Sequence, residues 1–129
     1  MTRVAILVDD HAHARHLADV VTDLDAGWLV AHAPSIAGLA RMLSEVIPDA
    51  VVTDLSLPGA SCAEDCLGRV RALWTGPLAV LTGDDSHDAR SACVRFAAPL
   101  HLKPLTPREV VAALDSLLTA PRVGAHPEG

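Results

Sequence analysis

Polar residues able to do chemistry stand just after four short apolar runs of the chain. Asp9 and Asp10 follow residues 4–8, and Asp54 comes two residues after the run 50–52. Thr82 follows residues 78–81, and Lys103 follows residues 100–102. Carboxylates, a lysine ammonium group and a hydroxyl together suit phosphoryl transfer to a carboxylate nucleophile, with the lysine binding the incoming anion.

Three carboxylates held close together need a partner that offsets their repulsion. Two unit charges about 4 Å apart repel by roughly 4 kcal/mol at an effective dielectric near 20. Such a cluster either shares protons or holds a hard divalent cation. Ligation by oxygen alone, with positions left for water and phosphate, favours Mg²⁺. We therefore predict a Mg²⁺ site if the fold brings Asp9, Asp10 and Asp54 together.

The elements that would position these residues follow from the apolar pattern. Short apolar runs typical of strands occupy residues 4–8, 28–30, 50–52, 78–81 and 100–102. Apolar residues three and four apart predict helices within residues 14–24, 36–47, 63–73, 89–96 and 110–117. Capping patterns support three of these helices: Pro34-Ser35, Ser61-x-x-Glu64 and Thr106-Pro107-Arg108-Glu109. The pattern predicts β-α repeated five times.

Strict β-α alternation with continuous apolar strands predicts an α/β fold, a doubly wound parallel sheet covered by helices on both faces. Right-handed crossovers leave the carboxyl ends of all strands on one edge, where ligands collect. The four polar motifs would then converge on that edge. We expect one domain over residues 1–119, and a flexible tail or the start of a linker over residues 120–129.

With these motifs in this order, the chain resembles the CheY-like receiver domain of two-component response regulators. The resemblance covers about residues 1–119 and implies a flavodoxin-like sheet of five strands in the order 2-1-3-4-5. The motifs that carry it are Asp9-Asp10, Asp54-Leu55-Ser56-Leu57-Pro58-Gly59, Thr82-Gly83 and Lys103-Pro104.

The resemblance implies a role for each matched acid. Asp54 would accept a phosphoryl group from a sensor histidine kinase or a histidine phosphotransfer protein. Asp10, Asp54 and the backbone carbonyl of Ser56 would bind Mg²⁺ directly, with Asp9 assisting through water. The domain would transfer a phosphoryl group to itself and lose it again, and would not act as an enzyme on other substrates.

The resemblance also implies how the phosphoryl group would be held and how its arrival would be signalled. Lys103, the Thr82 hydroxyl and the backbone N–H of Gly83 would contact its oxygens. The new charge would then shift the population of an interaction surface that an output protein or effector domain recognises.

Three departures from the family pattern affect this switch. Leu100 stands three residues before the lysine, where family members usually carry Tyr or Phe. The usual Gly-Ala turn is replaced by Phe96-Ala97-Ala98-Pro99, and Leu105 stands where Phe is common. We expect intact phosphorylation chemistry without the usual aromatic relay.

Two other function classes stay open at this point. One is a receiver-like interaction module whose output does not depend on phosphorylation, which the missing aromatic favours. The other is a small Mg²⁺-dependent phosphohydrolase with an aspartyl-phosphate intermediate. Such enzymes usually carry a second acid two residues after the nucleophile, whereas position 56 is serine.

Composition excludes several partners. The chain has 129 residues and a formal charge of −6, with 16 acids against 10 lysines and arginines, which argues against direct binding of nucleic acid. The apolar run 4–8 is too short for a signal-peptide core or a membrane span, so we expect a cytoplasmic protein that does not bind membranes. A homodimer through the fourth and fifth helices stays open.

Three histidines near the first acids raise the question of a transition-metal site. On a helix, positions 11 and 13 point roughly 200° apart, so only His13 and His16 would share a face. We interpret His11, His13 and His16 as the solvated start of a helix.

Overall fold

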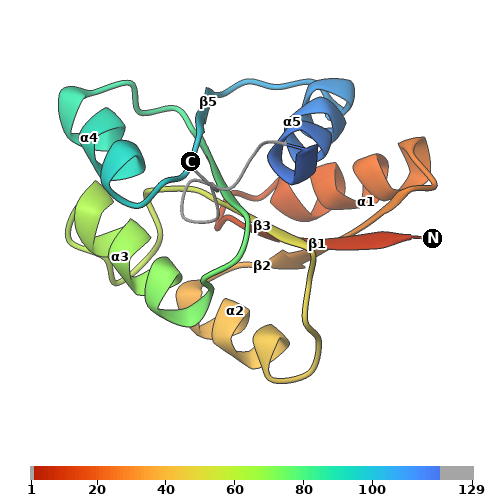
Figure 1. Cartoon of the computed structure of the whole chain (residues 1–129), viewed down its shortest axis with the longest axis horizontal. Coiled ribbons are helices and arrows are strands. Elements are labelled where there is room, and N and C mark those ends of the chain that lie inside the picture. Colours follow the sequence, from red (N-terminus) through yellow and green to blue (C-terminus); the bar gives the residue numbers. More distant parts are fainter. Residues whose placement is uncertain (1, 120–129) are drawn as a thin grey trace, which may run out of the picture.

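The computed structural model describes residues 2–119 and consists of one five-stranded parallel sheet between two layers of helices (Figure 1). The strands lie in the order β2-β1-β3-β4-β5, which confirms the predicted topology. The strands are β1 (Arg3–Val8), β2 (Trp28–Ala33), β3 (Ala50–Thr53), β4 (Leu78–Thr82) and β5 (Leu100–Leu102). The helices are α1 (Ala14–Leu24), α2 (Ile36–Leu43), α3 (Ala63–Leu73), α4 (His87–Arg95) and α5 (Pro107–Thr119). The tail predicted over residues 120–129 lies outside the described residues.

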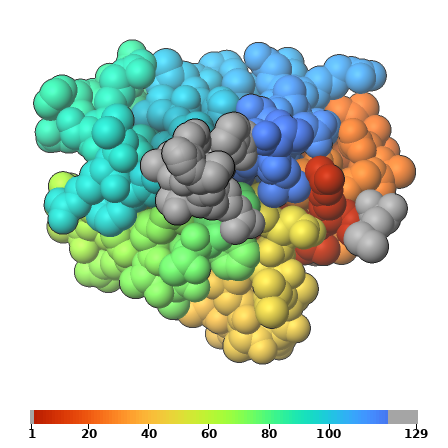
Figure 2. Space-filling view, in the orientation of Figure 1, coloured from red at the N-terminus to blue at the C-terminus, as the bar shows by residue number. Residues whose placement is uncertain are grey.

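The helices divide between the two faces of the sheet, and each face has its own apolar core. Helices α1 and α5 pack on one face, while α2, α3 and α4 pack on the other. Figure 2 shows the same layers in space-filling form, with α5 (blue) above β1 (red) and the segment around α2 (yellow) below. Both faces are therefore shielded, as expected for a parallel sheet.

The central strand β1 shows why its sequence is a continuous apolar run. Its side chains alternate between the two cores: Ala5 and Leu7 join the α1–α5 side, whereas Ile6 and Val8 join the other. All four residues are at most 3% exposed. Burying one such aliphatic side chain stabilises the fold by about 1.5–3 kcal/mol, so an apolar residue is favoured at every position.

The helix boundaries agree with the predicted caps at two of three places. Ser35 caps α2 by accepting the N–H of Gly38, and Thr106 and Glu109 form a reciprocal capping box at α5. At α3 the prediction was wrong by one residue, because Cys62 and not Ser61 is the N-cap. The side chain of Asp65 bonds back to the Ser61 N–H and hydroxyl, which makes Ser61 part of the preceding turn.

The second predicted helix is shorter than expected. It ends at Leu43, with Ser44 as its C-cap, and Ile47 is 85% exposed beyond it. Pro48 disfavours helical backbone at Ile47, the residue before it, which is the physical reason why the helix does not extend as far as predicted. Among residues 2–119, no helix combines the length and the apolar character that crossing a membrane requires.

Candidate functional site

Two buried acids are positioned by the pairing of the central strands. Asp9 directly follows β1 and Asp54 directly follows β3, and these strands pair with Val8 opposite Thr53. The backbone N–H of Asp54 donates to Val8 at 2.9 Å, which continues the ladder to the end of the strand. The side chain of Asp54 is only 2% exposed, while that of Asp10 is 39% exposed. The predicted acidic cluster therefore exists at the carboxyl edge of the sheet.

Lys103, the one lysine of the chain, reaches both buried acids from the end of β5. Its Nζ lies 2.7 Å from Oδ2 of Asp9 and 3.2 Å from Oδ2 of Asp54. The strand pairing sets its place, since the Lys103 N–H donates to the carbonyl of Thr82 at 2.9 Å. The ammonium group offsets part of the repulsion between the carboxylates.

The pKa directions of this pair follow from burial opposed by hydrogen bonding. Burial alone raises the pKa of Asp9, but hydrogen bonds from Lys103 and His11 outweigh it and leave the pKa below the ordinary 3.8. Burial likewise lowers the pKa of Lys103, and its contacts with Asp9 and Asp54 outweigh this and leave the pKa above 10.5. Both groups are therefore charged at neutral pH.

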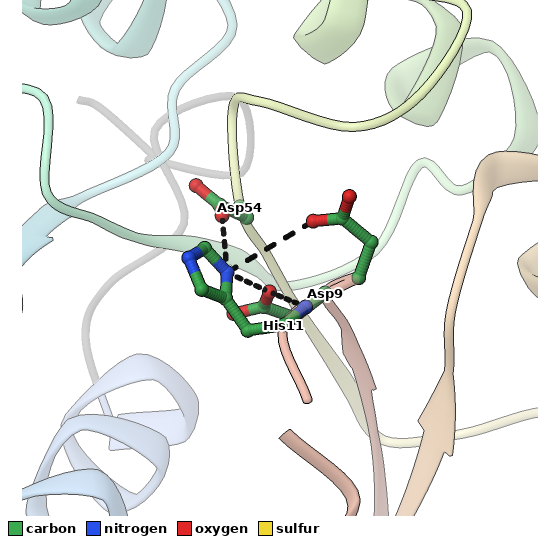
Figure 3. Close-up of side chains that lie close together, drawn as sticks. Asp9, His11 and Asp54 are labelled. Atoms are coloured by element: carbon green, nitrogen blue, oxygen red, sulfur yellow. Dashed lines mark hydrogen bonds and ion pairs between the residues drawn. The ribbon is translucent and has the colours of Figure 1, made fainter. Parts of the chain in front are cut away.

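His11 completes the cluster, and the sequence analysis missed it. Its Nδ1 lies 2.7 Å from Oδ1 of Asp9 and 3.6 Å from Oδ2 of Asp54, and the imidazole points toward both acids (Figure 3). The predicted helical start at residue 11 is wrong, since α1 begins at Ala14 with His13 as its N-cap. His13 and His16 are exposed as expected. The signal for His11 was its place directly after the two acids.

Three residues form hydrogen bonds with Asp9 and fix its position. Its Oδ1 accepts the backbone N–H of His11 at 2.9 Å, and its Oδ2 accepts Lys103. Its backbone carbonyl oxygen lies 2.7 Å from Nε2 of His32, which must carry the proton because a carbonyl oxygen only accepts. Asp9 thus does not cap α1 but anchors the loop that presents Asp10 and His11.

The donor set fits a divalent cation. Asp9, Asp10, His11 and Asp54 each offer one ligand atom, and these atoms all lie within 4.8 Å of one another. Ser56 is exposed two residues after Asp54, so its backbone lies at the same edge of the sheet. Carboxylate oxygens, a backbone carbonyl and room for water match the preference of Mg²⁺. Both oxygens of Asp9 and both oxygens of Asp54 already accept hydrogen bonds, and Asp10 is the most exposed of the three acids, so Asp10 is the acid most accessible for direct ligation.

Comparison with solved structures decides the fold. A candidate response regulator from Chloroflexus aurantiacus is 26% identical, with a TM-score of 0.76, covering 93% of this chain and all 100% of its own. A CheY-like receiver domain protein from Methanospirillum hungatei is 19% identical with a TM-score of 0.77, and the match covers 92% of this chain and 94% of that one. The chain has the fold of a CheY-like receiver domain. The chemotaxis response regulator CheY4 of Vibrio cholerae is 20% identical with a TM-score of 0.76, covering 92% of this chain and 100% of its own. No protein-family model and no curated protein sequence matches.

Within the receiver fold, the remaining predicted residues lie near the acidic cluster at the ends of β4 and β5. Thr82 ends β4 and is 1% exposed, and its hydroxyl oxygen accepts the N–H of Asp84 at 3.2 Å. Gly83 is exposed, and a Cβ built there would meet nothing within 4 Å. The structure therefore leaves open space beside Gly83 at this edge of the sheet.

Leu100, which replaces the usual aromatic of the receiver fold, points into the core that α3 and α4 cover. It is half-buried and packs against that apolar cluster. A leucine has no polar end to exchange between a buried and an exposed position. The rotating-aromatic relay is thus absent from this chain at position 100.

Proposed function

We propose that the protein is a response regulator receiver that accepts a phosphoryl group on Asp54 in a Mg²⁺-dependent reaction. The observation that carries the proposal is the buried Asp54 carboxylate, 2% exposed, with Nζ of Lys103 at 3.2 Å. A buried carboxylate beside a cation is suited to nucleophilic attack on phosphorus. The donor would be the phosphohistidine of a sensor histidine kinase or of a histidine phosphotransfer protein.

The chain's own residues account for each part of the transfer. One oxygen of Asp54 forms a bond to phosphorus, the bond from phosphorus to the donor histidine nitrogen breaks, and that nitrogen takes the released electron pair. The backbone N–H of Leu55 donates to Oδ1 of Asp54 at 2.7 Å, which fixes the plane of the carboxylate. When bound, Mg²⁺ would neutralise the phosphoryl oxygens, and Asp10, Asp54 and the Ser56 carbonyl are the groups that would hold it.

Lys103 and Thr82 would convert the new charge into a change of shape. The phosphoryl group adds acceptor oxygens that compete with Asp9 and Asp54 for the Lys103 ammonium. The Thr82 hydroxyl now accepts from Asp84, and as a donor to a phosphoryl oxygen it would pull on the β4–α4 loop. A few kcal/mol of differential contact suffices to shift such a two-state loop.

The surface that would bind a partner begins at the loop after β4, next to the acidic site. We propose that the loop after β4 and the neighbouring α4–β5–α5 surface bind an output protein, an effector domain or a second copy of the chain. We also propose that the protein is cytoplasmic and that it does not bind nucleic acid directly. Because Leu100 lacks the usual relay, a phosphorylation-independent output is the second candidate. Partner binding that is unchanged in Asp54→Asn would favour that second candidate.

The decisive experiment is intact mass spectrometry after incubation with acetyl phosphate and Mg²⁺. We expect one hydroxylamine-labile phosphoryl group on the natural chain, and none on Asp54→Asn or without Mg²⁺. Asp23→Asn, an exposed acid on α1, is the matched control and should be phosphorylated normally. An adduct that persists in Asp54→Asn would refute the assignment. Turnover of an external phosphate ester would instead support a phosphohydrolase.

A further inference from the structure

We propose that the acidic site also binds a borderline divalent cation such as Zn²⁺, with Nδ1 of His11 as a direct ligand beside Asp10 and Asp54. This inference rests on the metal site of the proposed function and deepens it, because it concerns which cations the site accepts. Receiver chemistry needs only oxygen ligands there. The imidazole of His11 is therefore an additional donor that this chain supplies.

The distances between the three donor atoms fit one metal ion. Nδ1 of His11 lies 3.6 Å from Oδ2 of Asp54 and 3.9 Å from Oδ1 of Asp10. Zinc binds histidine nitrogen and carboxylate oxygen at about 2.0–2.2 Å, so two ligands of one ion lie at most about 4.2 Å apart. Both of these separations are below that limit, and the ligand atoms of Asp10 and Asp54 lie within 4.8 Å of each other. One ion can therefore bind all three groups once the side chains draw closer together.

The backbone holds His11 ready for this role. Its N–H donates to Oδ1 of Asp9 at 2.9 Å, which turns the loop so that the imidazole folds back over the cluster. In the structure Nδ1 also contacts the same Oδ1 at 2.7 Å. If Nδ1 binds a metal, Asp9 keeps the backbone N–H and the Lys103 ammonium as partners. No buried acceptor is left unsatisfied by the exchange.

The position of His11 leaves the site open to an entering ion. The side chain is 62% exposed, whereas Asp54 beneath it is 2% exposed. Lys103 bonds Oδ2 of Asp9 at 2.7 Å and Oδ2 of Asp54 at 3.2 Å, and its Nζ is 3.4 Å from Nδ1 of His11. A metal bound by Asp10, His11 and Asp54 therefore competes with Lys103 for Asp54, whereas the bond from Lys103 to Asp9 involves no proposed ligand atom.

The chemistry of the donors predicts a change in selectivity. Mg²⁺ strongly prefers oxygen ligands, whereas imidazole suits zinc, cobalt and nickel. His11 therefore favours these ions over Mg²⁺ at the same acids. The neighbouring His13 serves as an internal control, because it is exposed, makes no capping hydrogen bond and lies outside the group of four ligands.

The test is calorimetric titration of the full chain, free of metal and of any polyhistidine tag, with ZnCl₂ and separately with MgCl₂. Replacing His11 by glutamine should lower the ratio of Zn²⁺ to Mg²⁺ affinity by about tenfold or more, since it removes one direct ligand. His13→Gln should leave the ratio unchanged within error. Titration with CoCl₂ gives a second readout, because loss of a nitrogen ligand changes the visible absorption of the bound cobalt.

Two results would overturn the inference. One is an unchanged affinity ratio and cobalt spectrum in His11→Gln, and the other is an equal loss in His13→Gln. The parent proposal fails by a different result, namely no Mg²⁺ binding and no phosphorylation of Asp54 in the natural chain. If Asp54 is phosphorylated with Mg²⁺ but the Zn²⁺ affinity does not depend on His11, only the inference about His11 is contradicted.

Discussion

Replacing Lys103 by methionine tests the electrostatic account of the acidic site, because methionine keeps the length of the side chain and removes its charge. At distances of 2.7 and 3.2 Å the ammonium attracts the carboxylates of Asp9 and Asp54. These attractions amount to about 6 and about 5 kcal/mol at an effective dielectric near 20. Desolvation of the three groups cancels most of this gain.

The net loss expected from the substitution is much smaller than the gross attraction. Removing one partner of a buried ion pair costs about 3–5 kcal/mol. Lys103 keeps 25% of its side chain exposed, which places the expected loss near the lower end, about 3 kcal/mol. For a domain of this size that loss lowers Tm by about 10 °C. Urea unfolding of metal-free protein at pH 7 measures it directly.

The stability difference between the natural chain and Lys103→Met should depend on pH in a definite direction. The pKa of Asp9 lies below 3.8 in the natural chain, so its charged form stabilises the fold above that pH and the gain is lost as pH falls through the folded pKa. Without Lys103, burial raises the pKa of Asp9 and acidification relieves the repulsion. The difference between the two chains should therefore shrink from pH 7 toward pH 3.5.

The assay has a built-in test of cause. Asp9→Asn and the double variant with Lys103→Met complete a thermodynamic cycle, in which the cost of losing the lysine should fall when Asp9 is neutral. A destabilisation below about 1 kcal/mol at pH 7, the range of an exposed ion pair, would refute the reasoning. So would a loss that stays the same across the whole pH range.

Three further predictions concern the site and the fold. Ala97→Gly should stabilise the protein by about 1 kcal/mol in urea unfolding, because Ala97 has φ of +54°, where a Cβ is strained; a loss of stability would contradict this. Arg71→Met should destabilise by about 2–3 kcal/mol, since the half-buried guanidinium donates to the carbonyls of Gly76 at 2.6 Å and Phe96 at 3.0 Å; Arg71→Lys should recover part of the loss, and equal losses in both would argue against a role for the guanidinium's two-pronged geometry. Mg²⁺ should raise the Tm of the natural chain but not of Asp10→Asn, and an equal rise in both would exclude Asp10 as a ligand.

The elements of the fold were predictable because their causes are local. Apolar runs and three-and-four spacing depend on neighbours in the sequence, and Thr106 with Glu109 encodes its own helix start. The predicted end of α2 and the predicted cap of α3 were wrong for different reasons. The helix α2 stops before Pro48, and at α3 the Asp65 side chain bonds Ser61 while the Asp65 N–H donates to Cys62, so the helix begins one residue later than the capping pattern indicated.

The meeting of Asp9, Asp54 and Lys103 was also predictable, once right-handed crossovers were assumed. That rule places every strand end on one edge, and the residues then need only follow their strands. Their distances and protonation were not predictable, because these depend on how far the Lys103 side chain reaches across β4 and β3 and on how much water it displaces.

The sequence by itself determined the order of strands and helices and the acids, hydroxyl and lysine that end on one edge, since these follow from periodicity and chain connectivity. Only the tertiary structure decided that His11 joins the acids and that His32 holds the Asp9 carbonyl. The physical reason is that both contacts depend on the turn between β1 and α1 and on the register of β1 with β2, where Leu7 lies opposite His32. Residue types alone predict neither this turn nor this register.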